Sequence, residues 1–233
     1  MSRLNFLDKY AVDGRHYDAH HEIDKAFGSD DPDVRALAIS HPKATKEHFD
    51  KALDDRNWNV RCAVIRHPNA TKEHFDKALN DTSEAVRREA VAQNTKATKG
   101  YLDKALNDEN AFVRKAVAIH PNATKEHLDK ALQDASWMVR QAAAIHSNAN
   151  KEQLHKALID SSDHVRWAVI HNHNVTTEHL DKAINDVNDR VREAVAESPK
   201  ATKEHLDVLL RDDNDYVRKA AKKNPNYKKF FSE

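Results

Sequence analysis

An internal repeat constrains this sequence more than any other feature. The segment from His120, HPNATKEHLDKALQDASWMVR, nearly copies the segment from His67, HPNATKEHFDKALNDTSEAVR. Aligning the recurrent Val-Arg dipeptides gives units spaced by 26 residues, except for the step from residue 70 to residue 97, which is 27. A short period kept over most of a chain is typical of stacked repeats that share a continuous core.

The alignment predicts about eight units in a single array over residues 18–226. Residues 1–17 are expected to form a lead-in or N-terminal cap, and residues 227–233 a C-terminal tail. The predicted units are 18–43, 44–69, 70–96, 97–122, 123–148, 149–174, 175–200 and 201–226.

Each unit carries two helix-start signals, residues whose side chains accept hydrogen bonds from the N–H groups of a first helical turn. The first signal is present in seven units, and Ala19 stands in its place in the first unit. These residues are Thr45, Thr71, Thr98, Thr124, Asn150, Thr176 and Thr202. The second signal is present in all eight units, as Asp31, Asn57, Ser83, Asn110, Ser136, Ser162, Asn188 and Asn214.

Apolar residues between these signals follow helical spacing, as in Phe49, Ala52 and Leu53. A proline often ends the second helix, as Pro68 does. We therefore predict an all-α fold of two-helix repeats in which stacking of the units supplies the stability. The extra residue of the 27-residue step lies near Arg87 and Arg88, and either a bulge in the helix or the loop before it can absorb it.

A polar pair recurs with constant spacing, because an acidic residue or Ser precedes an arginine by six positions in every unit. The first members are Ser29, Asp55, Asp81, Asp108, Asp134, Asp160, Asp186 and Asp212. The arginines are Arg35, Arg61, Arg87, Arg114, Arg140, Arg166, Arg192 and Arg218. This spacing lets a carboxylate meet the guanidinium of its own or of the next unit. Because the pair does not vary, we interpret it as structural.

Composition narrows the function classes. Lys plus Arg equals Asp plus Glu at 38 each, which argues against nonspecific binding to polyanions, although a local basic patch stays open. The single cysteine, Cys62, excludes an intramolecular disulfide and the CxxC type of metal site. Only three glycines are present, too few for a glycine-rich phosphate loop. Without a signal-peptide core or an apolar run of about 18 residues, we expect a soluble, cytoplasmic and monomeric protein with no cofactor.

The stretch NDENAFVRKAVAIHPNATKEHLDKAL, from Asn107, resembles the leucine-rich repeat variant, a two-helix repeat with the theme Asp, Val-Arg, Ala, Asn-Pro, Thr, Leu. Its Asp-to-Arg spacing and VRKA are also similar to HEAT and phycobilisome-lyase-type repeats. The resemblance covers nearly the whole chain. It implies a right-handed α-solenoid whose second helices line the concave surface, in families that mostly bind other macromolecules. The iron–sulfur cluster of the founding variant protein needs more cysteines than Cys62, and the basic groove of HEAT-like alkylpurine DNA glycosylases does not match the neutral charge balance here.

Residues that vary between units on the exposed face of the second helix are the candidates for function. This face comprises the first helical residue and those four and eight further on. The triplets include Trp58-Cys62-Arg66, Ala111-Lys115-Ile119, Trp137-Gln141-Ile145, Asp163-Trp167-His171 and Asp189-Glu193-Glu197, and so contain all three tryptophans. We expect an apolar patch centred on Trp137 and Trp167. Such a patch indicates a partner site. The alternative is that the two indole rings pack on neighbouring helices. The predicted partner-binding residues are Trp58, Arg66, Lys115, Ile119, Trp137, Gln141, Ile145, His164, Trp167 and His171.

Histidines are numerous, but most occupy two recurrent slots, which favours a structural role. His48, His74, His127, His179 and His205 lie in first helices, and His41, His67, His120 and His146 lie at the ends of second helices. The unit 149–174 is the most divergent and adds His164, His171 and His173. His164 and His171 are two turns apart, roughly 10 Å at 1.5 Å per residue, so we do not expect them to share a metal ion.

Three functions are compatible with these patterns. The one favoured is a non-catalytic adaptor or inhibitor that holds a protein or peptide in the concave groove. The second is binding of a nucleic acid or nucleotide, with tryptophans stacking on bases and Arg66, Lys115, Lys219 and Lys223 meeting phosphates. The third and least favoured is an enzyme, with Asp163, His164 and His171 around Trp167 as its best candidates.

Overall fold

The structure, a computed structural model, describes residues 19–231, so the predicted lead-in 1–17, the start of the first unit and the last two residues lie outside the described part. From residue 19 to residue 231 the chain is helical and contains no strand. The eight helix pairs are α2 (Ala19–Phe27) with α3 (Pro32–Ile39), α4 (Lys46–Ala52) with α5 (Trp58–Arg66), α6 (Lys72–Ala78) with α7 (Glu84–Gln93), α8 (Lys99–Ala105) with α9 (Ala111–Ala118), α10 (Lys125–Ala131) with α11 (Trp137–Ile145), α12 (Lys151–Ala157) with α13 (Asp163–His171), α14 (Thr177–Ala183) with α15 (Asp189–Glu197), and α16 (Lys203–Leu209) with α17 (Asp215–Lys223). A short helix, α18 (Tyr227–Phe231), follows.

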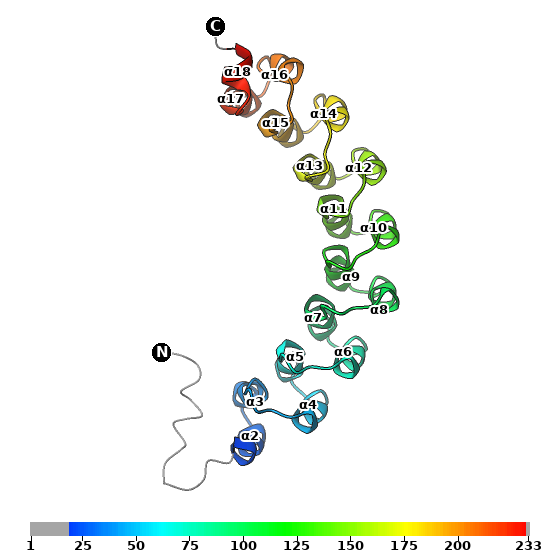
Figure 1. Ribbon diagram of the computed structural model, residues 1–233, viewed down its shortest axis with the longest axis vertical. Helices are drawn as coiled ribbons and strands as arrows, with labels where there is room; N and C mark the ends of the chain where they lie inside the picture. Colours follow the sequence, from blue (N-terminus) through cyan, green and yellow to red (C-terminus); the bar gives the residue numbers. More distant parts are fainter. Residues whose placement is uncertain (1–18, 232–233) are drawn as a thin grey trace. The chain divides into compact units, whose positions relative to one another are not determined.

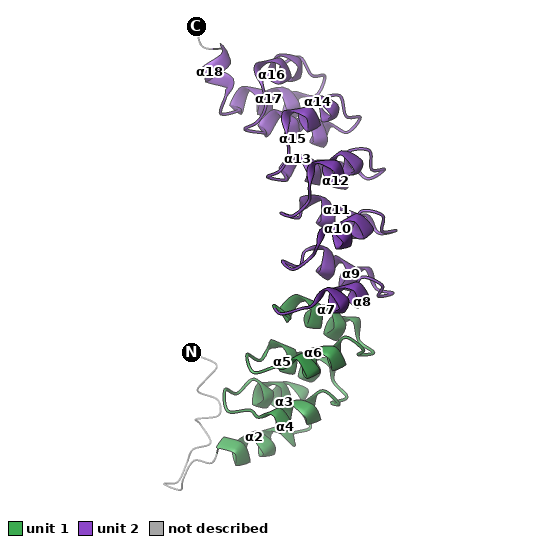
Figure 2. Cartoon of the chain, turned by 45° about the vertical axis from the view of Figure 1, so that its right-hand side comes forward, with its two compact units in different colours: residues 1–95 green, residues 96–233 purple. Residues whose placement is uncertain are grey.

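These pairs confirm the predicted all-α solenoid of two-helix repeats. The chain forms two compact units, of which unit 1 ends at Thr95 and unit 2 begins at Lys96 (Figure 2). The prediction of one uninterrupted array over residues 18–226 stays a prediction.

The predicted caps begin the helices. All eight residues of the second signal are N-caps, and the Asp and Asn side chains among them accept the N–H two residues on, as Asn110 does from Phe112 at 2.8 Å. The seven residues of the first signal are N-caps of the first helices. The Asp and Asn caps thus satisfy locally a backbone group that a helix start leaves without a partner, whereas Ser83, Ser136 and Ser162 make no such side-chain bond.

The core of unit 2 lies between the two rows of helices. First helices contribute the fully buried Leu128, Leu154, Leu180 and Leu206, and second helices contribute buried valine and alanine, such as Val139. Consecutive second helices make the most extensive helix–helix contacts, with the first helices outside them (Figure 1). The more closely packed row is the inner side of the stack within unit 2, and the small alanine side chains permit that approach.

The Asp-to-Arg pair connects adjacent repeats. Arg140 donates through Nε and Nη2 to both carboxylate oxygens of Asp160, twenty residues on, at 2.7 and 2.9 Å, and through Nη1 to the carbonyl of Asp134 in its own repeat. The carboxylate also accepts the N–H of Ser162. The same bidentate pair forms at Arg35–Asp55, Arg61–Asp81, Arg114–Asp134, Arg166–Asp186 and Arg192–Asp212. In these six pairs the guanidinium of the preceding repeat is the partner of the carboxylate, which supports the structural interpretation and shows which of the two possible partners is used.

The two histidine slots are structural as predicted. In the first slot, the N–H of Thr71 donates to Nδ1 of His74, whose Nε2 lies 3.2 Å from Asp50 of the preceding repeat. In the second slot, Nε2–H of His146 donates to the carbonyl of His120, and Nδ1 accepts the N–H of Asn148. The rings of His74 and His146 therefore each fix a turn of their own repeat and reach the repeat before it.

The extra residue of the 27-residue step lengthens a second helix. Helix α7 has ten residues where α5 and α11 have nine. Arg87, not Arg88, occupies the ladder position, since its Nη1 donates to the carbonyl of Asp81 just as Arg61 donates to that of Asp55. Unit 1 ends two residues after α7, at Thr95.

Candidate functional site

The second helices of unit 2 carry large apolar side chains on their exposed face. Trp137 begins α11 and is 40 % exposed, and Ile145 ends the same helix at 44 %. Ile119, the C-cap of α9, is 55 % exposed. Since burial of such side chains is the main stabilising term in folding and association, this row is the strongest candidate for a contact surface in unit 2.

Trp137 is held in place by the next repeat. Its ring stacks on that of His164, the second residue of α13, with 4.5 Å between ring centroids and 22° between the planes. The sequence placed both residues in the predicted site without predicting that they form a pair. The stacked histidine reduces the motion of the indole and leaves much of its surface exposed.

Trp167 is held within its own helix. His171, one turn further along α13, stacks on it with 3.7 Å between centroids and 27° between planes. Nδ1 of His171 lies 3.1 Å from the carbonyl of Trp167, so this nitrogen carries the proton. The predicted aromatic patch therefore consists of two stacked Trp–His pairs.

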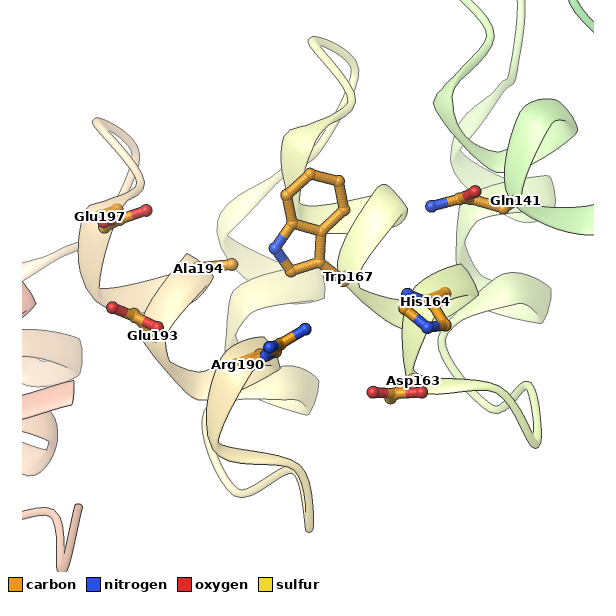
Figure 3. A pocket seen from close by; sticks show the side chains of 8 residues that line it. All are labelled: Gln141, Asp163, His164, Trp167, Arg190, Glu193, Ala194 and Glu197. Carbon is orange, nitrogen blue, oxygen red and sulfur yellow. The ribbon is translucent and has the colours of Figure 1, made fainter. Parts of the chain in front are cut away.

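Trp167 lines a pocket of about 400 Å³ over α11, α13 and α15 (Figure 3). Gln141 and His164 lie on one side of the indole, with Asp163 below His164, and Arg190, Glu193 and Glu197 lie on the other. Nδ2 of Asn188 donates to the carboxylate of Asp163 at 2.8 Å. The pocket therefore combines an aromatic surface with three carboxylates and one guanidinium.

Arg190, Glu193 and Glu197 were among neither the predicted partner-binding residues nor the candidates for catalysis. Glu193 and Glu197 were on the exposed face that the sequence defined, but they are charged residues on a helix without an aromatic and gave no further signal. Arg190, the second residue of α15, lies outside the first, fifth and ninth positions that define the predicted face. Its inclusion depends on the packing of α15 against α13.

Cys62 was predicted to lie on the exposed face of the second helix, and this prediction is wrong because the residue is buried. It is 1 % exposed, and burial raises the pKa of its thiol to about 11. The middle position of the triplet turns toward the neighbouring second helix, so a small apolar residue there is covered. Gln141, Lys115 and Trp167, at the same position, are longer and are half-buried.

The two predicted residues of unit 1 lie at opposite ends of α5. Trp58 begins the helix and is 49 % exposed. Arg66 ends it and is ion-paired with Glu89 of α7 at 2.8 Å. The cation of Arg66 is therefore already compensated within unit 1.

Asp163 and His164 line the pocket beside Trp167, whereas His171 lines the neighbouring one, so the three candidates for catalysis do not share one pocket. Asp163 bonds to Asn188, His164 stacks on Trp137, and His171 stacks on Trp167. Across residues 19–231 no group of three or more His, Cys, Asp or Glu side chains is placed to hold a metal ion. None of the described helices has both the length and the apolar content needed to cross a bilayer.

Comparison with solved structures bears on the fold. The chain is similar to a leucine-rich repeat variant with a TM-score of 0.66 and 22 % sequence identity, over 86 % of this chain and 79 % of that one. The chain therefore shares its fold with the leucine-rich repeat variant. It is also similar to the Escherichia coli protein YibA, with a TM-score of 0.52 and 21 % identity, over 88 % of this chain and 92 % of that one. No protein-family model and no curated protein sequence matches the chain.

These likenesses confirm the predicted resemblance to the leucine-rich repeat variant at the level of the fold. The resemblance to HEAT repeats in particular stays a prediction. At 21 and 22 % identity the comparisons carry no function across, so function has to be argued from the surface of the repeats.

Proposed function

We propose that this chain is a non-catalytic adaptor or inhibitor whose second helices in unit 2 bind a protein or peptide. The observation that supports this most is that Trp137 and Trp167 are each stacked on a histidine while the first of them stays 40 % exposed. Tryptophan is among the residues that contribute most binding energy at interfaces, and a ring already fixed in place loses little entropy on binding.

Ile119 and Ile145 extend the proposed surface along the stack. They occupy equivalent positions at the ends of α9 and α11, with exposed fractions of 55 and 44 %. Because consecutive second helices pack closely, such positions recur along the inner side of unit 2. An extended segment of a partner can contact several of them in succession.

Lys115, Gln141, His164 and His171 complete the proposed contact set in unit 2, all exposed or half-buried. Trp58 and Arg66 are proposed as partner contacts of unit 1.

The charges argue for a protein partner over a nucleic acid. Of the four cations that the nucleic-acid hypothesis requires, Arg66 is ion-paired with Glu89 and Lys219 with Asp215. Three carboxylates line the pocket beside Trp167, where a phosphate would be repelled. Asp163, His164 and His171 each contact a different partner, Asn188, Trp137 and Trp167, which favours a non-catalytic role over an enzyme.

Selection from a random peptide library, with the full chain as bait, tests the proposal. Peptides enriched on the wild type are expected to lose binding to the Trp137→Ala, Trp167→Ala double variant, with circular dichroism showing that the variant is folded. The Tyr216→Ala variant, which removes an aromatic side chain that is 69 % exposed on α17 and outside the proposed contact set, serves as the control. Equal binding to wild type and double variant, or enrichment of no peptide, would contradict the proposal, and tight salt-dependent binding of a single-stranded oligonucleotide would favour the nucleic-acid hypothesis.

A further inference from the structure

We propose that the pocket between α13 and α15 recognises an arginine side chain of the bound partner. This inference rests on the proposed function, because it names the chemistry of the partner at one point of the same surface. Four observations support it: the charge of the pocket, the absence of ion pairs at two of its carboxylates, the position of Trp167, and the volume.

The pocket has an excess of negative charge. Asp163, Glu193 and Glu197 face a single cation, Arg190, in a chain whose total charge is zero. The first turn of α15 adds Asp189, whose carboxylate accepts a hydrogen bond from Asn214. A partner that completes this site therefore brings positive charge.

Two of these carboxylates are not used by the fold. Among the described residues, neither Glu193 nor Glu197 makes a hydrogen bond or an ion pair with a side chain, whereas most acids of the first helices, such as Glu152 with Lys156, are paired. Arg190 lies three residues before Glu193 on α15, and within the described part of the chain no ion pair joins the two. The acids are thus free to bind a cation without breaking an existing bond.

Trp167 supplies a flat surface beside these acids. His171 stacks on the indole but lines the neighbouring pocket with Asn172 and Pro199, not this one, so the part of the ring that lines the acidic pocket is left to a ligand. A guanidinium is the side-chain cation that both stacks on an aromatic ring and forms two parallel hydrogen bonds to a carboxylate.

A pocket of about 400 Å³ is larger than a guanidinium needs and is open enough for a long side chain to enter from an extended segment. The apolar row at Ile119, Ile145 and Trp137 then holds the rest of that segment. The partner is accordingly a segment with apolar anchors and at least one arginine.

The affinity of the full chain for arginine is measured by fluorescence anisotropy with a labelled peptide. The peptide consists of Gly, Ser and Arg and has arginine at every second position. The matched probe replaces each arginine with citrulline, which keeps the shape of the side chain and removes its charge. We expect the citrulline peptide to bind about tenfold more weakly, since loss of one well-placed cation corresponds to about one such factor. Trp167→Ala is expected to weaken the arginine peptide by a similar factor.

The charge of the pocket is tested with two double variants that change the net charge equally. Glu193→Gln with Glu197→Gln removes the free carboxylates of the pocket and is expected to weaken the arginine peptide about tenfold. Glu152→Gln with Asp207→Asn removes two carboxylates from the first helices and is expected to change binding less than about twofold.

Each outcome decides the inference. Equal affinity for the arginine and citrulline peptides overturns it, and so does equal loss in the two double variants, which would show attraction by overall charge alone. If library peptides without arginine depend on Trp137 and Trp167 while the arginine peptide does not bind, the inference fails and the proposed function stands. If neither kind of peptide binds, both fail.

Discussion

At the scale of single residues, the same histidine position serves two repeats at once. Its Nδ1 accepts the N–H of the cap in its own helix, which leaves Nε2–H to face an aspartate of the preceding repeat, as in His205 with Asp181 at 2.7 Å. The aspartate itself is replaced in one repeat, where His155 stands at the position that is aspartate in the others. Nε2 of the following His179 then donates to the carbonyl of Lys151, and the two imidazole rings lie 4.3 Å apart.

The His155–His179 pair predicts acid sensitivity. Burial lowers the pKa of His179, and the backbone hydrogen bond to Lys151 opposes this shift while His155 adds to it; Glu178 and Lys151 are the other charged groups facing it. Because the folded state binds this proton less readily than the unfolded state, its contribution is complete above the ordinary histidine value of about 6.5 and falls as the pH drops below it. We expect His155→Asp to restore the aspartate contact and stabilise the protein by about 1 kcal/mol at pH 6.

Urea unfolding at pH 5, 6 and 7.5 measures this effect. The gain from His155→Asp should increase as the pH falls, while His173→Asp, a change at an exposed loop histidine, should show no such trend. A gain that is the same at all three pH values would rule out the histidine pair as the cause.

The arginine ladder predicts a large loss from a single side chain. Arg140 and Asp160 are 14 and 10 % exposed, so Arg140→Ala leaves a buried carboxylate without its cation and is expected to cost about 3–5 kcal/mol in the free energy of unfolding. Lys156→Ala breaks an ion pair whose partners are 63 and 68 % exposed and is expected to cost less than about 0.5 kcal/mol. Chemical denaturation of both variants makes the comparison, and equal costs would contradict the structural role of the ladder.

The burial of Cys62 predicts that its thiol reacts slowly with a disulfide reagent in the folded protein. At 1 % exposure and with its pKa raised to about 11, the thiol is expected to react with a disulfide reagent only when unit 1 opens. Reaction with the reagent as a function of urea should therefore follow unfolding. Rapid labelling in the native protein would place Cys62 on the exposed face that the sequence analysis gave it.

At the scale of the helix, the sequence predicts where a helix begins better than it predicts which side chains of neighbouring helices it contacts. Caps such as Asn110 act on residues two or three positions away, so their effect can be recognised from the sequence alone. The stacking of Trp137 on His164 depends on how α11 packs against α13, and the burial of Cys62 depends on α5 and its neighbouring second helix. These contacts between helices are where the predicted site needed correction.

The first helix α12 offers a test of the shared capping position. Gln153 replaces the usual histidine, and its amide accepts the N–H of Asn150 and donates to Lys125 and Asp129 of the preceding repeat. Gln153→His restores the usual residue and should change the free energy of unfolding by less than about 1 kcal/mol, whereas Gln153→Leu leaves buried groups unpaired and should cost about 2 kcal/mol. Similar values for both, measured by urea unfolding, would show that this position stabilises by packing alone.

At the scale of the whole molecule, consecutive repeats within unit 2 make equivalent contacts. The Arg-to-Asp bond spans twenty residues at every step where it forms, so removal of residues 123–148 brings Arg114 into register with Asp160. We expect that deletion to give a folded, helical and less stable chain, with a smaller urea m-value because less surface is exposed on unfolding. Deletion of residues 123–135 removes half a repeat and should lose the cooperative transition, and a folded product from it would contradict the repeat boundaries.

The fold could be predicted from the sequence because the same structural signals occur in nearly every repeat. Caps, apolar spacing and the Asp-to-Arg pair each recur, so a chance match in one unit is corrected by the others. The proposed binding surface is present once. Glu193 and Arg190 carry no repeated signal, and their place beside Trp167 follows only from the packing of α15 on α13.

The central claim is that the second-helix face of unit 2 binds a peptide through Trp137 and Trp167. The three tryptophans of the chain give three indole N–H signals in a ¹H–¹⁵N NMR spectrum, each assigned by one Trp→Phe variant. Titration with a library-selected peptide should shift the Trp137 and Trp167 signals along one binding curve. If a bound peptide leaves both of these signals where they were, the account of this surface is wrong.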